Sequence, residues 1–292
     1  LDARVEANGA LVAQAREMGI RVETGAAISK VKGSKFVTGV AICAQAGEGT
    51  PTEEIKCDVV AMSGGWSPIV HLWSHCGGKL NWDADQAMFR PDPARPPLGD
   101  DGKGFVIVGG TANGYLDAAS AMKDAIAQGR KAAKEAGHKP AAAKAVKAVS
   151  VAEAAIEPIW QMPQGMSPKL QMKTFLDYQN DVKVSDVRLA AREGYESVEH
   201  TKRYTTLGMA TDQGKLSNIN GLAILADSLN AEIPQVGTTT FRPPYHPISM
   251  GAIAGDARGD LFKPIRKTPI HTWMDENGGF FEPVAGWPRP FW

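Results

Sequence analysis

Residues 104–133, GFVIVGGTANGYLDAASAMKDAIAQGRKAA, constrain the fold most, because they join an apolar run to a helical pattern through a glycine-rich turn. The run Phe105–Val108 predicts a buried strand, and the spacing of apolar residues predicts an amphipathic helix over Leu116–Ala133. This order is typical of a parallel α/β fold. Glycines in the turn and the free N–H groups of the helix terminus could hold a dinucleotide pyrophosphate. A tight turn without a ligand explains the pattern equally well.

The N-terminal part of the chain is typical of an α/β unit being completed. Residues 5–18 predict a helix that Gly19 ends, and residues 20–24 predict a strand. Residues 26–49 predict two β-segments joined at the sequence GSK, and residues 54–68 form a β-rich run that ends in a glycine turn. The strand, GxGxxG turn and helix that should begin such a unit are absent.

Composition excludes several classes of protein. The 292 residues are 43% hydrophobic, which is enough for two or three cores, and 32 basic residues balance 32 acidic ones, so no net field recruits nucleic acid. There is no apolar run of membrane-spanning length and no secretory signal, so we expect a cytoplasmic protein that does not contact a membrane. The three cysteines show no disulfide or metal-ligand spacing. The basic stretch 131–148 is interpreted as a solvated helix end and a linker.

The segment 173–230 predicts three short helices around a glycine-bearing loop. Ser185, Ser197 and Ser217 are the expected N-caps, and Gly194 is the expected end of the first helix. The loop that follows the second helix gathers cations, hydroxyls and amides, which are the groups that bind phosphate. The candidate phosphate ligands are Lys202, Arg203, Thr205, Thr206, Thr211, Gln213 and Lys215. Solvated cations and helix-capping threonines are an equally good interpretation.

The histidines and the C-terminal prolines yield weaker signals. His71 and His75 have the i, i+4 spacing of helical metal ligands, but we favour packing next to Trp73 because no third ligand is near. No catalytic residue and no metal ligand is assigned. Prolines in the run 236–255 exclude a long helix, so this segment is expected to be extended over a surface. Its side chains Phe241, Arg242 and Tyr245 either anchor a partner subunit or pack on their own domain.

Residues 57–68 and 105–133 together resemble the flavoprotein reductases that contain two dinucleotide-binding domains. Gly110 stands where that family carries an acidic residue. The run SGGWSPIVHLWSHCGGKLNWD, residues 63–83, is more specific and resembles the α subunits of heterotetrameric sarcosine oxidases. The resemblance extends over essentially the whole chain. It implies an α/β, Rossmann-like FAD/NAD(P)-binding fold, of which this chain is an internal piece truncated at both ends.

The resemblance also implies cofactors and partners. Enzymes of the sarcosine oxidase family oxidise sarcosine to glycine, with hydrogen peroxide and either formaldehyde or 5,10-methylenetetrahydrofolate as the other products. FAD, held in the β subunit, performs the oxidation, so no catalytic residue is expected here; γ and δ subunits complete the assembly. FMN at the interface with the β subunit would use the candidate phosphate ligands of the loop. NAD would contact Ser63, Gly64, Gly65 and Trp66, and also Gly109, Gly110, Thr111, Ala112, Asn113 and Gly114.

The three-helix segment resembles the bacterioferritin-associated-ferredoxin-like modules of amino-acid dehydrogenase subunits. Those modules bind an iron–sulfur cluster through four cysteines, whose positions fall here on Asp177, Gln179, Asp212 and Ser217. Because none of these is a thiolate, the resemblance implies a module without a cluster. The question is then what the loop GMATDQGKLS, residues 208–217, does. The expected answer is binding of phosphate and contact with another subunit.

The end of the chain resembles the first element of the aminomethyltransferase fold, which binds tetrahydrofolate. We therefore predict the end of an NAD-binding domain at 1–136, a linker at 137–170, the helical module at 171–232, an extended interface segment at 233–264 and the start of a folate domain at 265–292. An apolar patch is expected from Phe280, Phe281, Trp287, Phe291 and Trp292. Two alternatives remain: the α subunit of an amino-acid or opine dehydrogenase, and a non-catalytic scaffold that a nucleotide stabilises.

Overall fold

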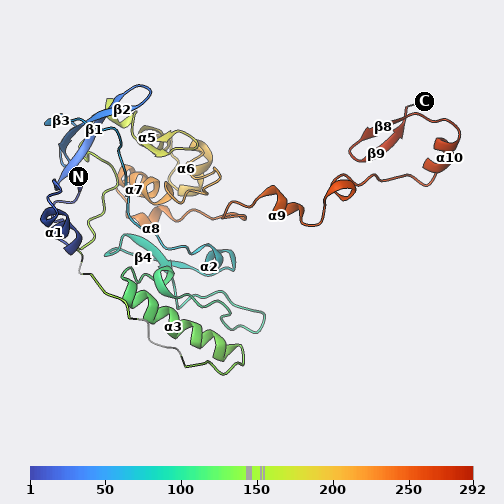
Figure 1. Cartoon of the computed structure of the whole chain (residues 1–292), viewed down its shortest axis with the longest axis horizontal. Coiled ribbons are helices and arrows are strands. Elements are labelled where there is room, and N and C mark those ends of the chain that lie inside the picture. The colour runs from blue at the N-terminus through green and yellow to red at the C-terminus, as the bar shows by residue number, and fades with distance from the viewer. Residues whose placement is uncertain (143–146, 152, 154, 292) are drawn as a thin grey trace. The chain divides into compact units, whose positions relative to one another are not determined.

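The computed structural model describes residues 1–142, 147–151, 153 and 155–291, which form two units, Leu1–Tyr245 and His246–Trp292 (Figure 1). Both helices and strands are present, so the mixed α/β class is confirmed. Parts of the predicted linker, residues 143–146, 152 and 154, and Trp292 of the predicted apolar patch lie outside the described residues. The domain limits inferred from the sequence stay a prediction.

The N-terminal strands form a small antiparallel sheet. β1 (Ala26–Gly33), β2 (Val37–Ala44) and β3 (Glu53–Ile55) pair in this order, which confirms the two β-segments joined at GSK. The expected helix is shorter, α1 (Ala10–Glu17), and has no buried residue. The expected strand at 20–24 is wrong, since Thr24 makes a single bridge to Asp2, and the β-rich run at 54–68 is wrong beyond β3.

The following segment contains α2 (His71–His75), the hairpin β4 (Leu80–Asp83) with β5 (Met88–Pro91), the short 3-10 helix η1 (Gly110–Asn113) and α3 (Ala118–Glu135). The helix expected at 116–133 is thus confirmed within two residues. The strand expected at Phe105–Val108 is wrong: Phe105 is 58% exposed and the run is irregular. An isolated apolar run has no neighbouring strand among the described residues to satisfy its backbone groups, so it does not become a strand.

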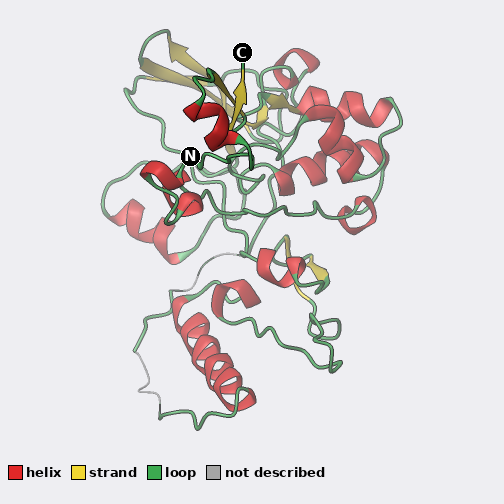
Figure 2. Ribbon diagram, turned by 90° about the vertical axis from the view of Figure 1, so that its right-hand side faces the viewer, coloured by secondary structure: helices red, strands yellow, loops and turns green. Residues whose placement is uncertain are grey.

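Three helices form the central module, as predicted. After α4 (Pro168–Gln171) and the hairpin β6 (Phe175–Asp177) with β7 (Val182–Lys183) come α5 (Val184–Arg192), α6 (Val198–Thr205), α7 (Asn218–Leu229) and the short α8 (Ile233–Val236). In Figure 2, which is coloured by secondary structure, helices and loops make up most of the chain and strands only a small part.

The expected helix caps are correct in part. Ser197 caps α6 by accepting a hydrogen bond from the His200 N–H, and Gly194 follows α5 in the left-handed region that glycine favours. Ser185 is not a cap, because Lys183 holds that position and Asp186 accepts the Lys183 N–H. Ser217 occupies the N-cap position of α7, but its side chain makes no capping hydrogen bond.

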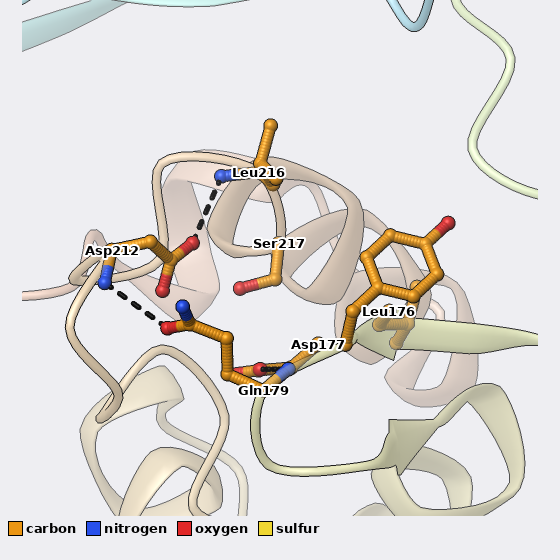
Figure 3. A pocket seen from close by; sticks show the side chains of 7 residues that line it. Leu176, Asp177, Gln179, Asp212, Leu216 and Ser217 are labelled. Carbon is orange, nitrogen blue, oxygen red and sulfur yellow. Dashed lines mark hydrogen bonds between the residues drawn. The ribbon is translucent and has the colours of Figure 1, made fainter. Parts of the chain in front are cut away.

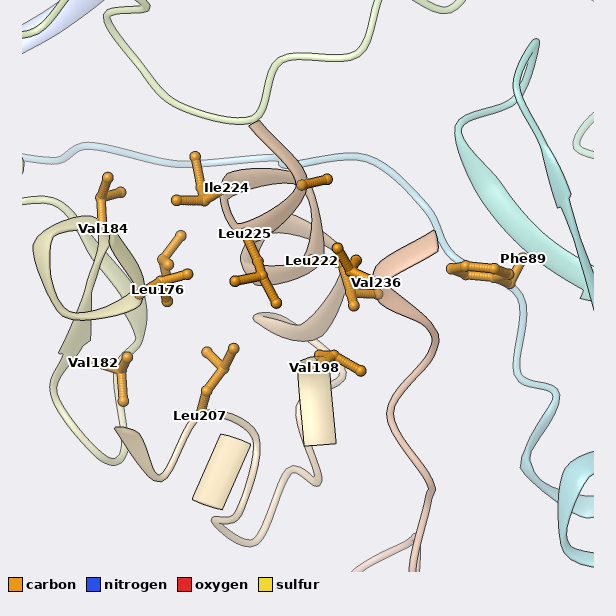
Figure 4. Close-up of a cluster of buried hydrophobic side chains, with 12 residues drawn as sticks. Phe89, Leu176, Val182, Val184, Val198, Leu207, Leu222, Ile224, Leu225 and Val236 are labelled. Carbon is orange, nitrogen blue, oxygen red and sulfur yellow. The ribbon is translucent and has the colours of Figure 1, made fainter. Parts of the chain in front are cut away.

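The buried core lies between α5, α6, α7 and the β6–β7 hairpin (Figure 4). α7 supplies the largest share, because its run of apolar residues is buried nearly all round. The core side chains are Phe89, Leu176, Val182, Val184, Val187, Val198, Leu207, Leu222, Ile224, Leu225, Ala226 and Val236. This core holds rigidly the ends of α6 and α7, and therefore the loop between them.

The second unit is small. It contains α9 (Met250–Ala254), η2 (Gly259–Leu261), α10 (His271–Glu276) and the hairpin β8 (Phe281–Val284) with β9 (Trp287–Pro290). The aromatic side chains Phe280, Trp287 and Phe291 are exposed, as expected, whereas Phe281 is half-buried against His271. Among the described residues, no helix is long and apolar enough to cross a bilayer.

Candidate functional site

A buried carboxylate organises the loop between α6 and α7. Asp177, at the end of β6, is 2% exposed. Its Oδ1 accepts the N–H groups of Gln179 and Asn180 at 2.9 Å, and its Oδ2 accepts the N–H of Gly208 at 2.8 Å. Asp177 therefore ties the β6–β7 turn to the start of the loop, at a position that the family resemblance gives to a cluster cysteine.

Two glycines let the loop close on α7. Gly208 and Gly214 both have positive φ values, and a Cβ atom at either would collide with the side chain of Asn218. Asn218 is buried and donates from Nδ2 to the Gln213 carbonyl at 3.3 Å. The glycines of GMATDQGK are thus required by the tight fold of the loop itself.

The four positions that correspond to the cluster cysteines of the ferredoxin-like modules surround one small cavity of about 50 Å³ (Figure 3). Asp177, Gln179, Asp212 and Ser217 all line it, with Gln179 Oε1 accepting the Asp212 N–H at 3.2 Å. The space is sufficient for a few water molecules. No cluster of three or more metal-ligating side chains occurs in the described ranges, and oxygen ligands do not suit an iron–sulfur cluster.

A second hollow of about 80 Å³ shares no lining residue with this cavity and gathers positive charge. We call it the basic groove; its lining residues are Glu199, Lys202, Arg203, Met209, Gln213 and Arg242. Three cations therefore face one carboxylate. Arg203 and Arg242 are exposed, and neither forms an ion pair or side-chain hydrogen bond with the residues that the structure describes.

Lys202 is the buried member of this groove, so of the two interpretations of these cations, that of a solvated side chain is wrong for Lys202. It is 6% exposed, and its Nζ donates to the Thr240 carbonyl at 3.1 Å and lies 4.0 Å from Glu199 Oε1. Burial lowers the pKa of Lys202, the Glu199 carboxylate opposes this effect, and the charges of Arg242 and Arg203 add to it.

Of the other predicted phosphate ligands, only Gln213 lines this groove. Thr205 donates to the Thr201 carbonyl at 2.7 Å and Thr206 to the Thr205 carbonyl at 2.6 Å, as in the helix-end interpretation. Thr211 is exposed. Lys215 donates to the Tyr245 carbonyl at 2.6 Å and lies 4.0 Å above the Tyr245 ring.

Arg242 was not among the predicted cofactor ligands. The sequence placed it in the extended segment, 39 residues after Arg203 and 40 after Lys202, and sequence spacing does not show that this segment returns to α6. The signal that could have found it is the isolated charge in TTTFRPPY, a run otherwise without charged side chains.

Aromatic contacts show that the part of the extended segment up to Tyr245 packs on the first unit. Tyr245 is buried and stacks on His71, with ring centroids 4.3 Å apart, and Phe241 meets the Tyr245 ring at 4.8 Å. His75 Nε2 lies 2.8 Å from the Phe241 carbonyl oxygen. These contacts agree with the interpretation of His71 as a packed side chain. Trp73, on the same short helix, is also buried.

The glycine turn before α3 is closed by carboxylates. Asp124 Oδ2 accepts the Gly110 N–H at 2.9 Å, and its two oxygens also accept the side-chain amides of Asn113 and Gln128 at 3.3 and 3.1 Å. Burial would raise the pKa of Asp124, but these hydrogen bonds outweigh it and the pKa is lowered. Asp117 caps α3 by accepting the Ser120 N–H at 2.9 Å. The Gly110 and Ser120 N–H groups, which an anion could otherwise use, are therefore already engaged by carboxylates.

The other predicted NAD segment is separate from this turn. Ser63, Gly64, Gly65 and Trp66 are all exposed, with Trp66 at 86%, and no hydrogen bond among the described residues joins them to Gly109–Gly114. Around the turn, Thr111 is exposed, Ala112 and Asn113 are half-buried, and Gly114 is buried. Arg90 donates to the Asn113 carbonyl at 2.8 Å, which fixes the turn to β5.

Similar sequences agree with this architecture. Residues 171–257, which include the loop and most of the extended segment, match the family described as the sarcosine oxidase A3 domain. Sarcosine oxidase subunit alpha of Rhizobium meliloti (strain 1021) is 38% identical over 93% of this chain and 26% of its own length. The Corynebacterium sp. (strain P-1) protein of the same name is 37% identical over 100% of this chain and 30% of its own length.

A solved structure shares the fold. The L-proline dehydrogenase from P. horikoshii superposes with a TM-score of 0.58 over 84% of this chain and 47% of that chain, at 18% identity. The chain spans less than a third of the length of the curated relatives that it matches. The chain is a member of the sarcosine oxidase α subunit family, and its basic groove lies within the A3 domain.

Proposed function

We propose that this chain is the part of a sarcosine oxidase α subunit that holds the phosphate of FMN in the basic groove. The observation that carries the proposal is the pair of uncommitted guanidinium groups, Arg203 and Arg242, beside the buried cation of Lys202. Guanidinium groups bind phosphate oxygens through paired, charge-assisted hydrogen bonds. Neither guanidinium group is engaged by a side chain among the described residues, whereas the carboxylate of Glu199 already accepts the Thr240 N–H at 2.6 Å.

The size of the groove supports a phosphate as its occupant. Whole ligands occupy pockets of about 300–1,000 Å³, whereas the groove measures about 80 Å³. A phosphate group can enter such a space, and the flavin ring would then lie outside it, against another surface. An FMN shared between the α and β subunits meets this requirement.

NAD belongs to the same proposal, with Ser63–Trp66 and Gly109–Gly114 as its candidate contacts. The residues of the turn do not fit a pyrophosphate, because Asp124 accepts the Gly110 N–H and Asp117 places a second carboxylate at the start of α3. Carboxylates accept hydrogen bonds from ribose hydroxyls. A contact of NAD with this turn would therefore be through its ribose.

The remaining elements of the proposal come from the family. The layout would be a Rossmann-like NAD-binding domain, the ferredoxin-like helical module and the start of a folate-binding aminomethyltransferase domain, in a cytoplasmic assembly with β, γ and δ subunits. The enzyme would oxidise sarcosine to glycine and hydrogen peroxide, with formaldehyde or 5,10-methylenetetrahydrofolate. FAD in the β subunit supplies the oxidation chemistry, and the residues described in this chain contribute binding and positioning.

The test is the FMN content of the complete complex in which Lys202 and Arg203 are both changed to alanine. Loss of two phosphate ligands should lower FMN content, counted as released plus protein-retained flavin, and leave NAD content unchanged. Arg192→Ala, which removes one exposed arginine of α5 outside the groove, is the control for loss of a surface charge, and Arg203→Ala alone is its one-charge counterpart within the groove. Normal FMN content in the double variant would show that the phosphate assignment is wrong. Stoichiometric iron in the wild-type complex would favour the dehydrogenase alternative instead.

A further inference from the structure

The extended segment Gly237–Tyr245 is held against α6 at a single residue by both of its backbone groups. The Thr240 N–H donates to Glu199 Oε1 at 2.6 Å, and the Thr240 carbonyl accepts from Lys202 Nζ at 3.1 Å. Glu199 and Lys202 are one turn apart on α6 and lie 4.0 Å from each other. The helix thus presents an acceptor and a donor to one residue, as a neighbouring strand would.

Arg242 follows two residues after this anchor. Further contacts hold the chain on either side of it: the Phe241 carbonyl lies 2.8 Å from His75 Nε2, and the Tyr245 carbonyl accepts from Lys215 at 2.6 Å. The backbone of Arg242 is therefore fixed, while its guanidinium group remains exposed in the groove. Fixing a binding group before the ligand arrives reduces the entropy lost on binding.

Resting on the proposed phosphate site, we propose that Glu199 is a positioning residue, which holds the Thr240 backbone on α6 so that Arg242 completes the phosphate site. The proposal runs against simple electrostatics. Glu199 is the one carboxylate among the six lining residues of the groove, so its charge opposes an anion. Its hydrogen bond favours the same anion indirectly, because it brings a second guanidinium group to the site.

These two effects of Glu199 can be separated by substitution. Glu199→Gln removes the charge and keeps an oxygen that can accept the Thr240 N–H. Glu199→Asp keeps the charge and withdraws the oxygen by one methylene, which breaks a contact of 2.6 Å. Glu199→Ala removes both. If Glu199 acts only through charge, Asp behaves as wild type and both Gln and Ala bind phosphate more tightly; if it positions Arg242, Asp and Ala bind more weakly and Gln does not.

The experiment titrates FMN, and separately inorganic phosphate, into the flavin-depleted full complex. Loss of one charged ligand from a phosphate site typically weakens binding by about tenfold or more. We expect that loss for Glu199→Ala and Glu199→Asp, and unchanged or tighter binding for Glu199→Gln. The proposal would be overturned if Glu199→Gln lost as much affinity as Glu199→Ala, or if Glu199→Asp bound as tightly as wild type.

A double-mutant cycle shows whether Glu199 acts through Arg242. In an Arg242→Ala background, Glu199→Asp should cause no further loss of FMN affinity, and a full additional loss would contradict the positioning role. The unfolding temperature of each complex identifies a variant that fails to fold. If Glu199→Ala does not fold, the Gln and Asp variants still distinguish a charge effect from a positioning effect. Failure of the phosphate site itself has a different signature, because Arg203→Ala and Arg242→Ala would then leave FMN affinity unchanged.

Discussion

Two glycine-bearing loops of this chain are built around a carboxylate, yet they differ in what they leave free. In the turn before α3, Asp124 accepts the Gly110 N–H and two side-chain amides. In the loop between α6 and α7, Asp177 accepts three backbone N–H groups. The second loop also borders the basic groove, in which Arg203 and Arg242 form no ion pair or side-chain hydrogen bond with the described part of the chain. Glycine spacing therefore does not distinguish a phosphate site from a closed turn; the engagement of the nearby donors does.

The two carboxylates differ in burial, and therefore in the free-energy cost of removing them. Asp177 is 2% exposed, whereas Asp124 is only half-buried. A buried donor that loses its acceptor keeps the full cost of its desolvation, and water can replace the acceptor at a partly exposed site. The same substitution should thus have unequal effects in the two loops.

The largest expected effect is that of Asp177→Ala. Three backbone N–H groups would lose their acceptor, and one of these hydrogen bonds, to Gly208, is buried. We expect a loss of about 3–5 kcal/mol in the free energy of unfolding, in the range seen when buried polar networks are broken. Denaturant unfolding of the complex, followed with hydrogen exchange at residues 177–180 and 208, measures it.

Asp177→Asn is the control, since its amide oxygen can still accept. It should recover part of the loss, because two acceptor oxygens become one. If Asp177→Ala costs less than about 1 kcal/mol, the carboxylate does not organise the loop and the comparison with Asp124 fails.

The corresponding change in the turn, Asp124→Ala, should have a smaller effect. Its partners are partly exposed, so we expect a loss of about 1–2 kcal/mol. The lowered pKa of Asp124 means that its contribution is present above the ordinary carboxyl pKa of 3.8 and is lost as the pH falls through the lowered value. The difference in stability between wild type and variant should therefore be constant well above pH 3.8 and shrink as the pH falls below that value. A difference that persists undiminished at lower pH would contradict this.

Local patterns predicted some of this architecture and missed the rest for a physical reason. The hairpin at GSK, the helix α3 and the three helices of the module follow from spacing, caps and glycines within a few residues, and the structure has them. The strand at Phe105–Val108 depends on a neighbouring strand, which periodicity cannot show. Arg242 lines the groove in a segment that Glu199 and Lys202 bind at Thr240, through contacts across about 40 residues of sequence that local patterns cannot show.

A smaller effect is expected from the pH dependence of the groove. Because the pKa of Lys202 is lowered from 10.5, its charge is lost at a lower pH than that of an ordinary lysine. Phosphate affinity should fall severalfold as the pH rises through that lowered value. Stability should change in the opposite sense, increasing between the lowered pKa and 10.5, because the unfolded state then binds more protons. Phosphate titrations from pH 7 to pH 10 measure the first effect.

Lys202→Met is the control for this titration, since it removes the ionising group and keeps a long apolar stem. The decrease in affinity over this pH range should be smaller in the variant. An identical pH profile in Lys202→Met and wild type would assign the titration to another group.

The smallest expected effect is at Ser217, where the loop enters α7 beside the cavity that Asp177 also lines. Ser217 is 1% exposed, its hydroxyl has no hydrogen-bond partner among the described residues, and it does not cap the helix. Ser217→Ala should change stability by less than about 0.5 kcal/mol, since a hydroxyl without a partner contributes little. Ser197→Ala is the matched comparison: it removes a real cap on α6 and should cost about 1 kcal/mol.

A loss of stability at Ser217 equal to that at Ser197 would mean that the cavity holds an ordered water bonded to the hydroxyl. The polar groups that line the cavity would then be engaged, like those of the Asp124 turn. Near-neutral behaviour at Ser217 would instead show that its buried hydroxyl makes no stabilising polar contact, in contrast to the carboxylate of Asp177 that lines the same cavity.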